Sequence, residues 1–250
     1  MDATGPGSGA PRAEDRPPLI AAAPRWGAPG LAITAVGSFL AAVLASLAVV
    51  LALGMASKGA AQRTPEEILA LALLSDGALL LALLLLGRVL LRLRLSDLGF
   101  RRPRPGTIRS AAATGAGLWL LSIAVNALQI SFFGPNPQSL IVAVGTHTGP
   151  AALAMDLVTG AIVAPFAEEV LFRGLIFGGL AQRMPVAAAA GISALLFALS
   201  HGLGVVAPIF VLGLGLAYVY VRSGSIWAPM ATHATVNAIS LLLLFAVPRS

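Results

Sequence analysis

Long uninterrupted apolar runs are the feature that most restricts how this chain can fold. Several reach or exceed the roughly 20 residues that an α-helix needs to cross a bilayer. They are rich in Leu and Ala and do not alternate between polar and apolar residues, which indicates helices rather than a membrane β-barrel. Only 10% of the residues are charged, against about 25% in ordinary soluble domains. We therefore predict an all-α, polytopic transmembrane helical bundle.

The apolar runs divide the chain into a series of expected helices. The fourth run is long enough to tilt or kink, and Pro165 is its expected kink site because proline removes a backbone hydrogen bond. The fifth and sixth runs are short and joined by the Gly-rich stretch HGLG, so we expect them to be shallow or interrupted. We predict about seven spans, with six to eight compatible with the pattern. Their expected ranges are 31–54, 68–91, 108–132, 151–180, 186–200, 205–221 and 226–247.

The sequence before the first run has a different composition. Residues 1–27 are rich in Pro, Gly and Ala and carry mixed charges, so they bury little and are expected to be disordered. No compact charged start leads directly into an apolar core, and we therefore predict no cleaved signal peptide. The chain then divides into a tail at 1–27, N-terminal membrane helices and loops at 28–150, and a C-terminal core at 151–250.

Charge and cysteine content narrow the function and the orientation. The formal net charge is +6, but the basic residues cluster beside apolar runs, which favours contact with the lipid bilayer over binding of nucleic acid. The tail and the segment 88–109 are rich in arginine, whereas 134–150 contain neither lysine nor arginine. The positive-inside rule thus predicts a multi-pass protein of the cell membrane with a cytoplasmic N-terminus. Cysteine is absent, which excludes disulfides, thiolate metal sites and a cysteine nucleophile.

The stretch VAPFAEEVLFRGL places three ionisable side chains in an apolar setting, where they are costly and indicate function. On a helix, Glu169 and Arg173 stand at i and i+4 with the acid first, the favoured order for an ion pair. Glu168 lies roughly 100° around the helix and cannot share that pairing equally. A carboxylate without an ion-pair partner suits a general base or acid, so we interpret Glu168 as functional. The other two residues are equally compatible with a structural brace.

Two further polar clusters follow on later runs. In FALSH, Phe197 and His201 stand four residues apart, so the ring can lie against the imidazole and fix its orientation, although a lone histidine at a span end is typical of an interfacial residue. In HATVN, His233 and Asn237 share one helix face, where isolated polar pairs commonly join helices. Together with Glu168 the clusters supply a carboxylate, two imidazoles and an amide. That set can activate water and stabilise an oxyanion.

Other polar residues offer weaker alternatives. Asp76 and Asp156 would have to meet to form an aspartyl dyad, but they lie on different spans without a supporting motif. Ser200 is expected to point to another helix face than His201, so no serine–histidine pair is predicted. His147, in the stretch GTHTG, has no companion in the sequence and is expected to be solvated.

In order and approximate spacing, EEVLFRG, FALSH and HATVN resemble the EExxxR, FxxxH and HxxxN/D motifs of the CAAX prenyl endopeptidase and bacteriocin-processing (CPBP, or Abi) intramembrane proteases. The resemblance covers about residues 151–247, and three motifs in sequence are far more specific than one. It implies a protease core at 151–250 that hydrolyses a peptide bond of a membrane-associated protein or peptide.

The resemblance also implies roles for individual residues. Glu168 would activate the attacking water, His201 and His233 would be essential histidines, and Asn237 would bind the oxyanion. The supporting residues would be Glu169, Arg173 and Phe197. By the expected span ends, however, His201 lies near the outer surface and the others near the middle of the bilayer, a mismatch on the order of 10 Å.

Two mechanisms and two further functions remain open at this point. His201, His233 and Glu168 could bind a divalent metal, with zinc as the candidate, whose bound water would attack. Alternatively Glu168 activates water directly, which we favour because no HExxH sequence is present and asparagine is an unusual zinc ligand. The alternatives to a protease are a non-catalytic scaffold or bacteriocin-immunity protein, and a proton-coupled carrier. The lack of an internal repeat weighs against the carrier.

Overall fold

The computed structural model describes residues 26–134 and 147–246, and every regular element in these ranges is helical. The long helices are α2 (Ala28–Ala52), α3 (Pro65–Leu91), α4 (Thr107–Phe133), a central helix (Pro150–Leu180), α9 (Val186–Ser200), α10 (Val206–Ser223) and α11 (Trp227–Ala246). Short 3₁₀ turns lie at Met55–Ser57, Ala60–Gln62, Leu95–Leu98 and Leu203–Val205. Six of the described helices are long and apolar enough to cross a membrane, and α9, with 15 residues, is shorter.

The central helix is continuous but not regular. It consists of α6 (Pro150–Leu157), α7 (Ala164–Glu169) and α8 (Gly178–Leu180), with the π-helical segments Val158–Val163 and Val170–Phe177 between them. Such π-helical turns are rare and often mark functional sites. The two acidic residues of the EEVLFR stretch therefore lie on a short α-helical segment with widened turns on both sides.

The predicted architecture is confirmed. Each helix begins and ends within about three residues of its expected span, the usual uncertainty of helix boundaries. The fifth run is indeed short, while the sixth, α10, is an 18-residue helix. The predicted disordered tail lies outside the described residues except for its last two positions. Trp26 is buried there and its backbone N–H donates to Gln182 Oε1 at 3.0 Å.

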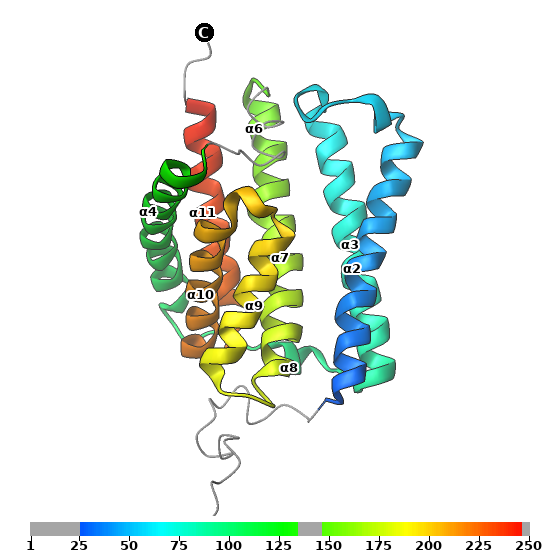
Figure 1. The fold of residues 1–250 in the computed structure, drawn as a ribbon, viewed down its shortest axis with the longest axis vertical. Coiled ribbons are helices and arrows are strands. Elements are labelled where there is room, and N and C mark those ends of the chain that lie inside the picture. Colours follow the sequence, from blue (N-terminus) through cyan, green and yellow to red (C-terminus); the bar gives the residue numbers. More distant parts are fainter. Residues whose placement is uncertain (1–25, 135–146, 247–250) are drawn as a thin grey trace, which may run out of the picture.

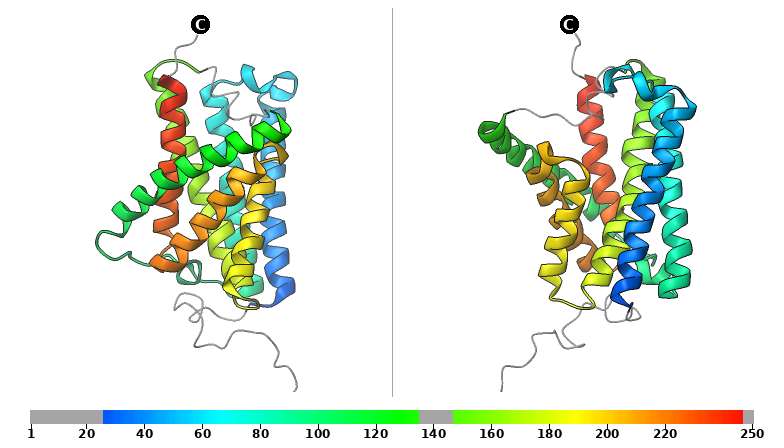
Figure 2. Two further views of the ribbon diagram at one scale, coloured as in Figure 1. Left: turned by 60° about the vertical axis from the view of Figure 1, so that its left-hand side comes forward. Right: turned by 45° about the vertical axis from the view of Figure 1, so that its right-hand side comes forward.

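The helices form two groups around the central helix (Figure 1). α2 and α3 form an antiparallel hairpin on one side, while α4, α10 and α11 pack on the other. α4 is strongly tilted across α11 (Figure 2). The two helices approach closely because Gly115 has no side chain: a Cβ there would lie 2.6 Å from the carbonyl oxygen of Thr232.

The α9–α10 hairpin does not extend the full height of the bundle. In Figures 1 and 2 the connection between α9 and α10 lies well below the upper ends of α3, α6 and α11. Gly202, with a φ of 96°, follows the last turn of α9 and lets the chain reverse at this depth. The C-terminal end of α9 is thereby placed below the upper ends of the neighbouring helices.

Candidate active site

A buried carboxylate at the centre of the bundle holds three helices together. Glu169, on the central helix, has no exposed surface, and its Oε1 accepts hydrogen bonds from Arg173 Nη1 at 3.0 Å and from His233 Nδ1 of α11 at 3.0 Å. Arg173 Nη2 donates to the carbonyl oxygen of Gly213 on α10 at 3.1 Å. The predicted i,i+4 ion pair is therefore confirmed. The link from the same carboxylate to His233 had no signal in the local sequence.

Phe197 of α9 connects this ion pair to both histidines. The guanidinium carbon of Arg173 lies 4.4 Å from the centre of the Phe197 ring, a cation–π contact. The ring packs edge-on against the imidazoles of His201 and His233, with centres 4.6 Å and 5.6 Å apart. The expected ring contact between Phe197 and His201 is confirmed, and the additional contact with His233 means that both imidazoles pack against the same phenyl group.

The structure places His201 at the site, so the depth mismatch suggested by the expected span ends is resolved by a short fifth helix. His201 Nε2 is 3.7 Å from Glu168 Oε1. The mismatch disappears because α9 is short and ends below the upper ends of the neighbouring helices, so that His201, the residue that follows it, reaches Glu168 on α7.

Hydrogen bonds to the second ring nitrogen orient each imidazole. His201 Nδ1 lies 2.8 Å from the carbonyl oxygen of Phe197, which accepts, so the hydrogen is assigned to Nδ1. His233 Nδ1 is assigned a hydrogen in the same way, because its partner is the carboxylate of Glu169. In the neutral rings both Nε2 atoms are then acceptors. They lie 3.7 Å from the two oxygens of Glu168, one beside each.

Glu168 differs from Glu169 because its side chain is partly exposed and forms no ion pair with an arginine. One quarter of its side chain is exposed, against none for Glu169. Each Glu168 oxygen lies 3.7 Å from a histidine Nε2, which is too far for a direct hydrogen bond. At such a distance a water molecule can bridge the two atoms. The centre can therefore hold a water between a carboxylate and two imidazole acceptors, where the carboxylate can take its proton.

Asn237 lies one turn beyond His233 on α11 and contacts the irregular part of the central helix. In the first π-helical segment the N–H of Ala164 bonds to the carbonyl of Thr159. The next donor in that register would be residue 165, a proline without an N–H. The carbonyl left without a donor is that of Gly160, and Asn237 Nδ2 donates to it at 2.7 Å. The amide thus uses one of its two hydrogens to satisfy this interruption of the helix.

The metal hypothesis was tested against the donor arrangement. Within the described ranges, no group of three or more His, Cys, Asp or Glu side chains has a geometry that could hold a metal ion. Glu169 Oε1 is already shared by Arg173 and His233. The arrangement around Glu168, His201 and His233 therefore does not fit a zinc site.

A large apolar hollow lies beside the centre, between α3, the central helix and α11. Its volume is about 770 Å³, and it is lined mainly by apolar side chains, with Asp76 as its acidic residue. Pro165 lines it one turn before Glu168, and Ala234 lines it directly after His233. The hollow therefore adjoins the helices that carry Glu168 and His233, two of the candidate catalytic groups. Asp76 therefore belongs to this hollow, whereas Asp156, the other candidate for an aspartyl dyad, contacts His147.

The remaining polar residues form other contacts. His147 is buried, with Nδ1 2.9 Å from Asp156 Oδ2 and Nε2 2.9 Å from the carbonyl oxygen of Arg63. Its expected solvation was wrong because tertiary packing supplies partners that are distant in sequence. Ser200 Oγ lies 3.3 Å from His201 Nδ1, contrary to expectation, but its hydrogen goes to the carbonyl of Phe197 at 2.8 Å. It is therefore not presented as a nucleophile.

Fold and site define a polytopic helical membrane protein with a glutamate–histidine centre inside its bundle. Residues 150–239 match the model of the Rce1-like family, the type II CAAX prenyl endopeptidases. A relative is the Bacillus subtilis (strain 168) protein named "Putative membrane peptidase YdiL", 29% identical over 93 residues. That match covers 37% of this chain and 38% of the relative's length. No solved structure matches the chain.

The shared carboxylate yields a prediction about stability. Glu169→Gln keeps the shape and an acceptor oxygen but removes the charge that balances Arg173, and should lower the free energy of unfolding by about 3–5 kcal/mol. Glu168→Gln, the matched change one residue away, should lower it by less than about 1 kcal/mol because that side chain has no close ion pair. Unfolding in mixed detergent–SDS micelles measures both. Equal losses in the two variants would show that the Glu169 contacts do not stabilise the bundle.

Proposed function

We propose that this protein is an intramembrane endopeptidase that hydrolyses a peptide bond with water activated by Glu168. The observation that carries the proposal is the convergence of two imidazole Nε2 atoms on the two oxygens of an accessible glutamate. The match of residues 150–239 to the Rce1-like family model supports it. A scaffold would require none of this orientation, because packing alone does not need two histidines of the same tautomer around one carboxylate.

In the proposed reaction, Glu168 is the group that takes and returns the proton. Glu168 takes a proton from water held between it and the two imidazoles, and the water oxygen attacks the carbonyl carbon of the substrate. The tetrahedral oxyanion then collapses, the carbon–nitrogen bond breaks, and Glu168 returns the proton to the leaving amine. The products are a carboxylic acid and an amine. The Nε2 atoms of His201 and His233 orient the water by accepting its second hydrogen. The Nδ1 hydrogen bonds of the two imidazoles hold the rings in place.

We assign stabilisation of the oxyanion to Asn237. Support comes from its hydrogen count: the bond to the Gly160 carbonyl uses one amide hydrogen, and a second remains on the same nitrogen. A donor fixed in this way requires little reorganisation when negative charge develops on the substrate oxygen. Its position one turn from His233 on α11 supports the assignment.

We propose that the substrate is a membrane-associated protein or peptide that occupies the apolar hollow beside Glu168. An extended apolar segment of the substrate would bind in the hollow and pack against the side chains of α3 and α11. The scissile bond would then lie at the level of α7. The protein would act as a multi-pass protein of the cell membrane with its N-terminus in the cytoplasm. The arginine-rich connection between α3 and α4 supports this orientation.

Replacement of the proposed base tests the function directly. Glu168→Gln should lower peptide-bond cleavage by about 10²- to 10⁴-fold, because the amide cannot accept the proton. The measurement is a proteomic comparison of membrane peptides between cells that express the wild type and cells that express the variant at equal levels. Glu66→Gln, an exposed acid at the start of α3, is the matched control and should cleave like the wild type. Substrate turnover by Glu168→Gln at the wild-type rate would refute the proposal.

Metal dependence separates the two mechanisms that the sequence left open. Direct activation by Glu168 predicts that the purified protein cleaves its substrate undiminished after dialysis against a chelator, and that elemental analysis finds no stoichiometric metal. A zinc mechanism would instead give loss of activity on chelation, recovery when zinc is returned, and one zinc per chain. That second result would overturn direct activation while leaving the peptidase assignment in place.

A further inference from the structure

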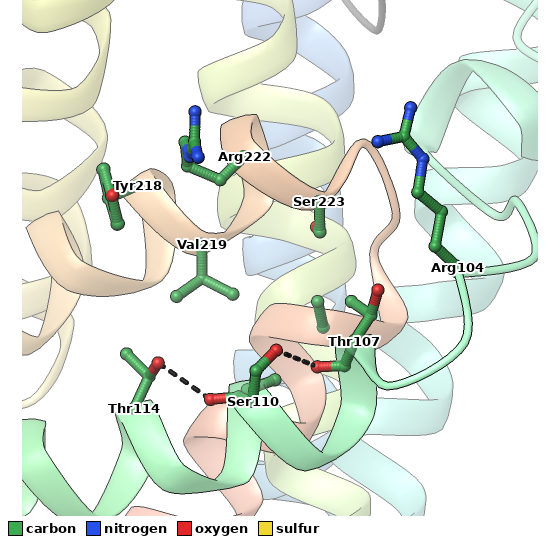
Figure 3. Close-up of a pocket in the computed structure, with 10 residues that line it drawn as sticks. Arg104, Thr107, Ser110, Thr114, Tyr218, Val219, Arg222 and Ser223 are labelled. Carbon is green, nitrogen blue, oxygen red and sulfur yellow. Dashed lines mark hydrogen bonds between the residues drawn. The ribbon is translucent and has the colours of Figure 1, made fainter.

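A second hollow lies at the arginine-rich end of the bundle, and Glu168 is not among the residues that line it. Its volume is about 290 Å³, and it lies between the beginning of α4 and the end of α10 (Figure 3). Val219 points from α10 toward α4 at its base. Polar side chains dominate the lining, which consists of Arg104, Thr107, Ser110, Thr114, Tyr218, Arg222 and Ser223 beside three apolar residues. This composition contrasts with the apolar lining of the hollow beside the proposed active site.

Two arginines at this hollow lack a carboxylate partner. In the part of the chain that the structure describes, neither Arg104 nor Arg222 takes part in an ion pair with an acid. The segments 88–110, 181–185 and 222–227 contain a single acidic residue, Asp97. Its Oδ2 accepts the backbone N–H of Arg94 at 2.9 Å. Positive charge is thus concentrated around the hollow and is not compensated by this neighbouring carboxylate.

The local backbone also favours an anion. No side chain caps the first turn of α4, and no acidic residue lies in that turn, so the positive end of the helix dipole faces the hollow uncompensated. Ser110 and Thr114 follow on the same side of α4, and their hydroxyls donate to carbonyls of the helix. Thr107 is a further hydroxyl at the helix start (Figure 3). Arginine and helix N-termini together are typical of phosphate recognition.

We propose that this hollow binds the phosphate group of a phosphate ester, the group that anionic phospholipid headgroups and small soluble phosphates share. The surroundings favour the lipid source. On α4, the side that carries Ser110 and Thr114 continues with Leu121 and Leu128, which are 47% and 59% exposed. Tyr218, 63% exposed on α10, has the position of an aromatic residue at a membrane interface. A headgroup in the hollow would therefore leave its acyl chains along an apolar helix face.

The test uses the full chain purified in a neutral detergent and native mass spectrometry with three probes: short-chain phosphatidylglycerol, phosphatidylcholine and inorganic phosphate. The wild type should bind one phosphatidylglycerol. Arg104→Gln/Arg222→Gln should weaken that binding about thirtyfold, since each arginine near an anionic headgroup contributes a factor of roughly five. Arg102→Gln/Arg109→Gln removes the same charge from exposed positions outside the hollow and should weaken binding less than about threefold.

Ser110→Leu provides a second variant that fills the hollow without changing charge, and it should also weaken binding. The probes identify the source: binding of phosphatidylglycerol but not of inorganic phosphate at the same concentration indicates a headgroup, and equal binding of both indicates a soluble phosphate ester. Equal losses in the two arginine pairs, unchanged binding in Ser110→Leu, or no binding of either phosphate probe would overturn the proposal.

Discussion

The structure depends on how one negative charge is balanced in an apolar interior. A buried carboxylate or guanidinium without a partner is destabilising by several kcal/mol, and no water is present in the hydrocarbon to compensate. Glu169 and Arg173 neutralise each other on the central helix. The same carboxylate accepts from His233, and the guanidinium donates to the Gly213 carbonyl. The contacts that remove the energetic cost of the charges are therefore also the contacts that position α10 and α11.

This balance leaves the adjacent carboxylate available. Because Glu169 takes both the arginine and the Nδ1 of one histidine, Glu168 remains without a close cation and faces two Nε2 atoms instead. Two neighbouring residues of the same type thus have different tasks, determined by which side of the helix each occupies. The widened turns before and after α7 also receive hydrogen bonds from other helices: Asn237 of α11 donates to the carbonyl of Gly160, and Ser193 of α9 donates to the carbonyl of Phe172.

The sequence predicted what is local. Apolar run length gave the helices and their ends, and four-residue spacing gave the Glu169–Arg173 pair and the contact between Phe197 and His201. Contacts between helices could not be predicted in this way, because periodicity says which face is polar but not what that face meets. The bond from Glu169 to His233 is of this kind, as are the partners of His147. The depth of His201 stayed open for the same reason, because the length of a 15-residue run does not say where in the bundle its helix ends.

The tautomers of the two site histidines are the most direct test, because the account requires both rings to carry their hydrogen on Nδ1 and to present Nε2 to Glu168. The chain has only three histidines, so ¹⁵N-histidine labelling and solid-state NMR of the full chain in bilayers give a short, assignable spectrum. A His147→Gln variant removes the third ring from it. We predict protonated Nδ1 and unprotonated Nε2 for His201 and His233 at neutral pH. A protonated Nε2 in either ring would contradict the proposed water site.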